Sequence, residues 1–247
     1  HSQHPFLLGM TALRAARAFA VPLVFTHHTR YEEYTHYVPV DSPALKAFVI
    51  ELATRYANLA DRVFAPSESI SDLLVERGVT TPVQVIPTGV YVEQFAADDR
   101  DGARRQWQLP ADAFVVGHMG RLADEKNIGF LADAVAVFLA GGNDRYFLVV
   151  GSGDAEADLA ERFRAAGLAE RLVRCGVLEG QALADAMNAM DVFAFASQSE
   201  TQGMVLTEAM AAGLPVVGLD DPGVREVVRD RHNGRLVAEP STAAFAE

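Results

Sequence analysis

Short apolar runs alternate with segments of helical periodicity through the first third of the chain. The apolar runs are bounded by Pro, Gly and Ser, as buried strands often are. The expected strands are residues 21–27, 61–67 and 83–90, and the expected helices are 4–19, 43–60 and 68–78, the last capped by Ser67. This alternation predicts a parallel sheet with helices on its faces.

The pattern lapses at residues 91–112, which are charged and turn-rich apart from one short helix near 100–107. A longer α/β series follows. Its expected strands are 114–120, 146–153, 172–177, 191–197, 215–220 and 234–239, and its expected helices are 125–140, 154–166, 180–190, 204–212 and 223–230. We predict a partial N-terminal domain at 1–96, a linker at 97–112 and a complete doubly wound C-terminal domain at 113–247. Three open parallel strands would leave much apolar face uncovered, so the first domain is expected to be incomplete.

The composition narrows the class of protein. The 247 residues include 21 Lys or Arg and 33 Asp or Glu, and the net charge of −12 argues against a nucleic-acid partner. The single cysteine excludes a disulfide within one chain and fits a reducing, cytoplasmic compartment. No apolar run approaches the roughly 20 residues of a membrane span. The chain does not begin with Met, and we expect it to be a fragment.

Residues 197–218 carry two glutamates around a glycine. Glu200 follows an expected strand, at the carboxyl end where open α/β sheets bind ligands. Gly203 lets the backbone approach a ligand, and the N–H groups of the helix that follows favour a phosphate. Glu208 lies on that helix and can accept hydrogen bonds from hydroxyls. The alternative is two solvated surface glutamates, which the apolar, glycine-punctuated surroundings disfavour.

Arg121 and Lys126 bracket a turn at the carboxyl end of the second domain's first strand. Two cations beside a glycine-containing turn and a helix N-terminus can clamp a pyrophosphate. The alternative is a solvated loop in which Asp124 and Glu125 neutralise the two cations.

Two further turns contain glycine. Gly151 and Gly153 begin a dinucleotide fingerprint, but the third glycine position holds Glu156. We therefore expect a tight strand-to-helix turn capped by Asp154. After the next strand, the main chain near Val177 could pair with a nucleobase.

Histidine, tyrosine and glutamate crowd residues 27–37, which is unusual for a loop and marks a candidate site. The spacing fits no common zinc motif, and structural, hydrogen-bonded histidines are the alternative. His28 directly ends a buried strand and is the one histidine here for which we expect a functional role.

Together these motifs resemble the retaining glycosyltransferases of family 4, which have two Rossmann-like domains facing a cleft, the GT-B fold. The strongest part is the E-x7-E motif from Glu200 to Glu208, followed by AMAAGLPVV. Further matches are GRLADEK, VIPTGVYVEQF and GVREVVRDRHNGRLV. The resemblance covers most of the chain, but the first βα units and the final helices of the family are lacking.

The resemblance implies a catalytic role for four residues. Arg121 and Lys126 match residues that hold the diphosphate and neutralise the charge growing on it. Glu200 matches a contact to the donor sugar. His28 matches a position near the acceptor and the anomeric carbon.

The resemblance also implies how the donor is bound. Glu208 matches the residue that binds the ribose hydroxyls. Main-chain groups of Gly203, Met204 and Val205 match contacts to phosphate and sugar, and the main chain near Val177 would hold the base.

The segment FTHHTRYEEYTHYVP is similar to the acceptor-side loop of bacterial diacylglycerol glucosyltransferases. This implies transfer of a hexose, with retained configuration, from a UDP-sugar (UDP-glucose first) or a GDP-sugar to a lipid or sugar acceptor. No cofactor or essential metal is implied. Arg14 and Arg17 could bring a cytoplasmic protein into peripheral contact with the inner face of the cell membrane, although ordinary surface arginines are the alternative. Other interpretations are a nucleotide-sugar epimerase or another GT-B enzyme, an NAD-dependent oxidoreductase, and a non-catalytic nucleotide-binding fragment.

Overall fold

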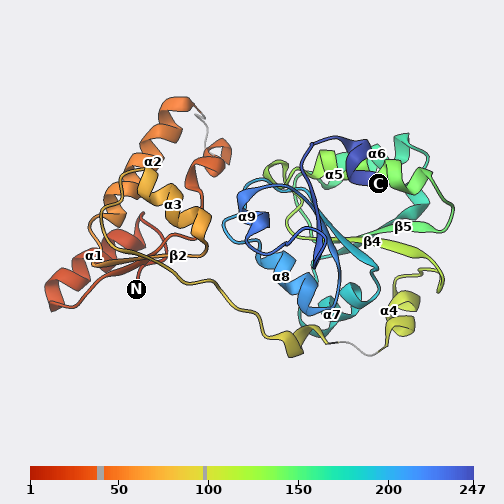
Figure 1. Ribbon diagram of the computed structural model, residues 1–247, viewed down its shortest axis with the longest axis horizontal. Helices are drawn as coiled ribbons and strands as arrows, with labels where there is room; N and C mark the ends of the chain where they lie inside the picture. The colour runs from red at the N-terminus through yellow and green to blue at the C-terminus, as the bar shows by residue number, and fades with distance from the viewer. Residues whose placement is uncertain (38–41, 97–98) are drawn as a thin grey trace. The chain divides into compact units, whose positions relative to one another are not determined.

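The computed structural model describes residues 1–37, 42–96 and 99–247. By their contacts the residues form two compact units. The first unit comprises His1–Thr88 and Ser199–Gln202, and the second comprises Gly89–Gln198 and Gly203–Glu247 (Figure 1).

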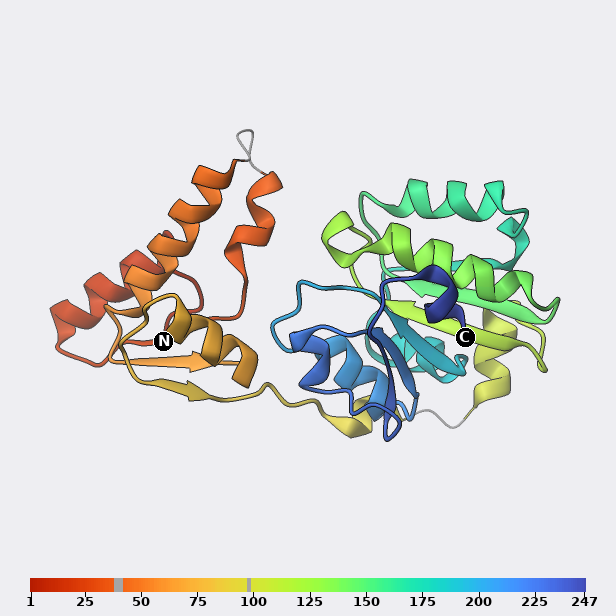
Figure 2. The same ribbon diagram turned by 45° about the horizontal axis from the view of Figure 1, so that its top comes forward.

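The first unit is a parallel sheet of three strands, as predicted. The strands β1 (Val24–Thr26), β2 (Arg62–Ala65) and β3 (Val83–Val85) lie in that order. The helices α1 (Leu8–Phe19), α2 (Pro43–Ala57) and α3 (Glu68–Glu76) cover one face of this sheet (Figure 2). Their apolar residues form one core with Phe25 and Val63 of the strands.

Caps set the helix boundaries of this unit. Ser67 caps α3, as predicted, by accepting a hydrogen bond from the amide of Ile70 at 3.3 Å. The prediction that the first helix begins at residue 4 was wrong, because Leu7 has a φ of 30° and the helix begins after it. The histidine-rich loop contains a regular element that the sequence analysis did not predict, the 3₁₀ helix η1 (Tyr31–Tyr37).

The second unit contains the six predicted strands, all parallel, in the order β6-β5-β4-β7-β8-β9. Their bounds are β4 (Phe114–Met119), β5 (Arg145–Val150), β6 (Leu172–Gly176), β7 (Val192–Phe195), β8 (Val216–Leu219) and β9 (Gly234–Val237). The order reverses between β4 and β7. The sheet is therefore doubly wound, with its topological switch point at these two strands.

Helices cover both faces of the second sheet (Figures 1 and 2). One face carries α5 (Ile128–Ala140), α6 (Glu156–Ala165) and α10 (Thr242–Ala246). The core on the other side includes residues of α4 (Arg100–Gln106), α7 (Gly180–Asn188), α8 (Met204–Ala211) and α9 (Pro222–Arg225). Three short 3₁₀ helices, η2 (Val92–Phe95), η3 (Asp124–Lys126) and η4 (Ala169–Arg171), lie in the connections.

Two helix boundaries in this unit differ from the prediction. The N-cap of α6 is Ala155, so the predicted cap by Asp154 was wrong. The helix predicted at 223–230 is shortened to α9, and Asp221 caps it by accepting from the amide of Gly223 at 3.0 Å.

An ion pair with a buried arginine lies at the amino edge of the second sheet. Arg104 of α4 is 4% exposed at its side chain and lies 2.8 Å from Asp191. It also donates to the carbonyl of Ala189. The same Asp191 carboxylate accepts from the amide of Val115 at 2.7 Å, at the start of β4. This pair therefore ties α4 to the amino ends of β4 and β7.

Candidate functional site

A cavity of about 360 Å³ opens at the carboxyl edge of the second sheet. It lies where β4, β5 and β6 end, as expected for a ligand site in an open parallel sheet. The lining residues are Met119, Gly120, Arg121, Val150, Gly151, Ser152, Val177 and Leu178. Arg121 and Val177, predicted to bind diphosphate and base, therefore line the same cavity.

Close contact between two backbone turns fixes the position of Arg121. Gly151 has a φ of 133°, and a Cβ there would lie 1.9 Å from the carbonyl oxygen of Gly120. Hydrogen bonds join the turns on either side of Arg121, from Gly120 N to Val150 O and from Leu122 N to Ser152 O, both 3.0 Å. The tight turn at Gly151 was predicted, but its contact with the turn that carries Arg121 was not, because Gly120 and Gly151 belong to different strand ends.

The two predicted cations follow β4. The Arg121 side chain is 44% exposed and forms an ion pair with Glu125. Lys126 ends η3. Asn127 has a φ of 56° and donates to the carbonyl of Ala196 at 3.2 Å, which ties this turn to the end of β7. Arg121 is thus partly neutralised, as the alternative interpretation proposed, but it also faces the cavity.

The E-x7-E segment supplies a helix N-terminus beside the switch point. Gly203 has a φ of 67° and is the N-cap of α8. A Cβ there would lie 3.0 Å from Leu206 and 3.3 Å from the carbonyl oxygen of Gly223. The first-turn amides of α8 belong to Met204 and Val205, and such groups have no partner inside a helix.

Glu208 lies in α8, and partial burial raises the pKa of its carboxyl group. Lys126, Gly203 and Glu208 do not line the cavity, although they follow the carboxyl ends of β4 and β7. Since both strands point to the same edge of the sheet, these residues lie on the side where the cavity opens.

Two other predicted site residues, His28 and Glu200, belong to the first unit by contacts. His28 follows β1, its Nε2 hydrogen-bonds to the Gln3 side chain, and partial burial lowers its pKa. Glu200 is half-buried in the loop Ser199–Gln202. The hydroxyl of Thr201, next to Glu200, donates to the carbonyl of His28 at 2.9 Å.

The side chain of Gln202 fastens the same loop by a pair of backbone-like hydrogen bonds. It accepts from the amide of Thr88 at 3.0 Å and donates to the carbonyl of Thr88 at 2.8 Å. Ser67, the cap of α3, also donates to the carbonyl of Thr201 at 2.6 Å. The first unit therefore brings Glu200 and His28 into one hydrogen-bonded region.

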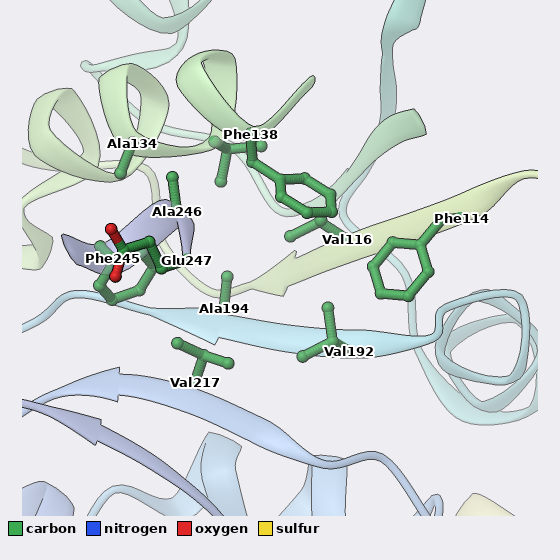
Figure 3. A pocket seen from close by; sticks show the side chains of 11 residues that line it. Phe114, Val116, Ala134, Phe138, Val192, Ala194, Val217, Phe245, Ala246 and Glu247 are labelled. Atoms are coloured by element: carbon green, nitrogen blue, oxygen red, sulfur yellow. The ribbon is translucent and has the colours of Figure 1, made fainter. Parts of the chain in front are cut away.

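A second cavity, of about 180 Å³, lies on a face of the second sheet (Figure 3). Figure 3 shows the side chains of Phe114, Val192, Val217 and Phe245 around it. Its only ionisable lining residue is Glu247, which is an acid. An apolar groove with no cation does not suit a diphosphate, so it is not a candidate donor site.

The described residues hold few signs of other chemistry. They contain no group of three or more His, Cys, Asp or Glu side chains arranged to hold a metal ion. Cys175 is half-buried, and burial raises the pKa of its thiol to about 12, so it is not a reactive cysteine. Within ranges 1–37, 42–96 and 99–247, no helix is both long and apolar enough to cross a bilayer.

Two parallel α/β units, the second doubly wound with a cation and glycine turns at the carboxyl edge of its sheet, fit the class of GT-B proteins. The sequence also matches two known families of glycosyltransferases. Residues 99–247 match the family described as glycosyl transferases group 1, and residues 1–94 match glycosyltransferase family 4. The chain belongs to the family of glycosyl transferases group 1, whose model matches more than half of it.

Curated relatives are named for the transfer of different sugars. The alpha-monoglucosyldiacylglycerol synthase of Streptococcus pneumoniae is 29% identical over 96% of this chain and 55% of its own length. The GDP-mannose-dependent alpha-mannosyltransferase of Mycobacterium tuberculosis is 33% identical over 96% of this chain and 59% of its own length. The chain therefore spans little more than half of these relatives.

Solved structures agree with the fold. Anabaena HepE, in complex with UDP and glucose, has a TM-score of 0.82 and 26% identity. The match covers 96% of this chain and 63% of that chain. The resemblance to GT-B glycosyltransferases stated from the sequence is thus confirmed in family and fold.

Proposed function

We propose that the protein containing this chain is a retaining hexosyltransferase that moves glucose from UDP-glucose to an acceptor hydroxyl. The observation that carries this proposal is the cavity at the carboxyl edge of the second sheet, where Arg121 and Val177 lie together. The cavity offers a cation, Arg121, for phosphate and an exposed main-chain turn after Gly176, at Val177, for a base. The relatives named above support transfer of a hexose.

The proposed chemistry is stabilisation of a leaving diphosphate. Arg121, Lys126 and the first turn of α8 would neutralise negative charge that grows as the bond to the anomeric carbon breaks. Because this charge is larger in the transition state than in the ground state, the contacts accelerate the reaction as well as bind the donor. We propose that these cations take the part of a metal ion, so activity should persist with a chelator present.

Glu200 and His28 are proposed to act at the sugar and the acceptor. At neutral pH the imidazole of His28 is uncharged, because burial lowers its pKa. An uncharged imidazole can accept a hydrogen bond from an acceptor hydroxyl. On a front-face route the leaving phosphate takes the acceptor proton, which retains the configuration at the anomeric carbon.

The leading acceptor is a membrane lipid such as diacylglycerol. Besides the lipid-glycosylating relative, the surface of α1 supports this proposal. The helix exposes Leu8 and Phe19, at 73% and 78%, together with Arg14 and Arg17. No acidic residue occurs before Glu32. An apolar and basic surface of this kind favours peripheral contact with an anionic bilayer, at the inner face of the cell membrane.

The test uses the full-length protein and a matrix of substrates. UDP-glucose and GDP-mannose are each offered with diacylglycerol in phosphatidylglycerol vesicles, with a small sugar and with inositol phosphate. Transfer of glucose to diacylglycerol from UDP-glucose, with an α-linked product by NMR, supports the whole proposal. Transfer only from GDP-mannose would contradict the donor, and turnover only with soluble acceptors would contradict the lipid. Failure to release UDP or GDP with any acceptor would overturn the proposed activity.

A further inference from the structure

The first unit holds a buried ion pair that has no place in the roles proposed above. An Nη2 atom of Arg77, the C-cap of α3, lies 2.5 Å from Oε1 of Glu32 in η1. The two side chains are 15% and 8% exposed. Arg30 lies 3.7 Å from the same oxygen and 2.9 Å from Glu33. Removing the charge of Glu32 leaves the largely buried guanidinium of Arg77 uncompensated, and removing Arg77 leaves Glu32 with only the longer contact to Arg30, so either change is more disruptive than losing a surface pair.

Glu32 remains charged at neutral pH despite its surroundings. Burial acts to raise the pKa of Glu32, but the hydrogen bond and charge of Arg77, together with the charge of Arg30, outweigh it. The net result is a lowered pKa. The pair therefore fixes η1 to the end of α3 by a charged contact between residues 45 positions apart.

A neutral histidine lies next to this pair. The ring of His27 is 5.4 Å from that of Tyr31 and 5.9 Å from that of Phe25, edge-on to both. His27 is 1% exposed, and among the described residues neither ring nitrogen has a hydrogen-bond partner. Its burial lowers its pKa to about 4. His27 therefore acts as a rigid spacer that packs Tyr31 of η1 against β1.

Tyr31 connects η1 to His28 through one residue. Its hydroxyl lies 3.5 Å from the carbonyl of Gln3, at the long end of the hydrogen-bond range. The side chain of Gln3 in turn hydrogen-bonds to Nε2 of His28. A displacement of η1 would thus reach the imidazole both through this bridge and through His27.

We propose that Arg77 and Glu32 are positioning residues, whose buried pair fixes η1 so that Tyr31 and Gln3 hold the His28 imidazole for the acceptor. The acceptor part of this inference rests on the proposed function of His28. The positioning part concerns only the chain itself and can be measured without any substrate.

The first experiment measures local order in the full chain. We compare wild type, Arg77→Met and the isosteric Glu32→Gln by hydrogen–deuterium exchange and by NMR titration of His28. The matched control is Arg55→Met, which removes an exposed ion pair with Glu51 on α2. We expect exchange in Tyr31–Tyr37 to accelerate about tenfold in both test variants, as it does when a local opening becomes easier.

The same variants should raise the pKa of His28 toward its ordinary value, because a loosened η1 would bury the imidazole less. Arg55→Met should change neither quantity. If Arg77→Met does not fold, Glu32→Gln decides alone, since it preserves the shape of the side chain. The proposal is overturned if folded Glu32→Gln leaves exchange in η1 and the His28 titration unchanged. It is also overturned if exchange rises equally throughout the first unit, because the pair would then stabilise the fold only.

The second experiment uses the active full-length protein. Glu32→Gln should raise the KM for the acceptor about tenfold through misplacement of the site, while the Kd for UDP stays unchanged. An unchanged acceptor KM would overturn the functional part of the inference. If wild type transfers no sugar, the proposed function fails, but the exchange and titration measurements still decide the positioning role.

Discussion

In the second unit the candidate donor site is held by the main chain, whereas in the first unit the candidate acceptor residues are held by side chains. The turn with Arg121 is fixed by backbone contact between Gly120 and Gly151. His28 depends on Gln3 and on its connection to η1. The comparison indicates that the donor site is sensitive to added atoms, and the acceptor side to lost charges and hydrogen bonds.

The largest expected effect comes from one methyl group at the donor site. Gly151→Ala would place a Cβ 1.9 Å from the carbonyl oxygen of Gly120. We expect the turns to separate, with a loss of about 2 kcal/mol in stability and about 100-fold in UDP affinity. Calorimetric titration with UDP and thermal unfolding measure the two effects.

Gly167→Ala is the matched control for that variant. Gly167 also has a positive φ, of 71°, but a Cβ there meets nothing within 4 Å. It should lose some stability and keep UDP affinity. Wild-type UDP binding by Gly151→Ala would show that the donor site does not depend on backbone contact.

The second effect concerns the charge of Lys126. Lys126→Ala should weaken UDP binding roughly 30-fold, equivalent to about 2 kcal/mol for a charge-assisted hydrogen bond. The loss should shrink as salt is added. The chain's other lysine, Lys46 on α2, provides the control, and Lys46→Ala should bind UDP as wild type does. Equal affinities of the two variants would remove Lys126 from the donor site.

The third effect separates the two glutamates of the E-x7-E motif. In the full-length protein, Glu200→Gln should lower kcat roughly tenfold with little change in the Kd for UDP, if Glu200 contacts the sugar mainly in the transition state. Glu208→Gln should instead raise the Kd, if Glu208 binds hydroxyls of the donor in both the ground state and the transition state. Steady-state kinetics together with calorimetry separate the two. Loss of affinity alone in both variants would contradict this division.

The smallest expected effect is a pH-dependent change in stability at Glu208. Burial raises its pKa above the ordinary 4.5 in the folded chain. Between the unfolded and folded pKa values the native state binds more protons, so its contribution to stability falls as pH rises through that interval. Glu208→Gln should therefore have a Tm close to wild type at pH 4 and slightly above it at pH 7.

Glu161→Gln tests the sign of that prediction. The exposed Glu161 pairs with Arg164, whose hydrogen bond lowers the pKa of the carboxyl group. This carboxylate contributes stability above its unfolded pKa, so its removal should leave the Tm at pH 7 unchanged or slightly lower. A Tm of Glu208→Gln below wild type at pH 7 would show that the carboxylate has a stabilising partner.

Regular elements were predictable from the sequence because their signals are local. The six strands of the second unit follow from apolar runs bounded by glycine and proline, and the cap at Ser67 from one residue before a helix. Gly213 likewise follows the end of α8 in a left-handed conformation, with a φ of 80°. At the start of α6, Asp154 was predicted as the cap, but the N-cap is the next residue, Ala155, whose side chain makes no capping hydrogen bond.

The sequence proposes candidate site residues one by one but not how they are arranged. The glycine pair at 151 and 153 suggested a tight turn, yet nothing local in the sequence indicates its contact with Gly120. Arg77 was missed for the same reason, since its partner Glu32 lies on a different element. Contacts of this kind depend on which strand ends and helix ends become neighbours, and the periodicity of a single segment does not contain that information.

The ion pair between Arg104 and Asp191 lies at the edge of the second sheet opposite to the candidate donor cavity, so the two edges have different roles. At the amino edge, the Asp191 carboxylate is held by Arg104 and by the amide of Val115. At the carboxyl edge, the loops open onto the cavity. Substitutions in this unit should therefore have different effects at the two ends of its strands. Those near the start of the strands should mainly affect folding, and those near the carboxyl ends should mainly affect ligand binding. Related chains can therefore change the loops at the carboxyl edge, and with them the ligand, while the amino edge with Arg104 and Asp191 stays the same.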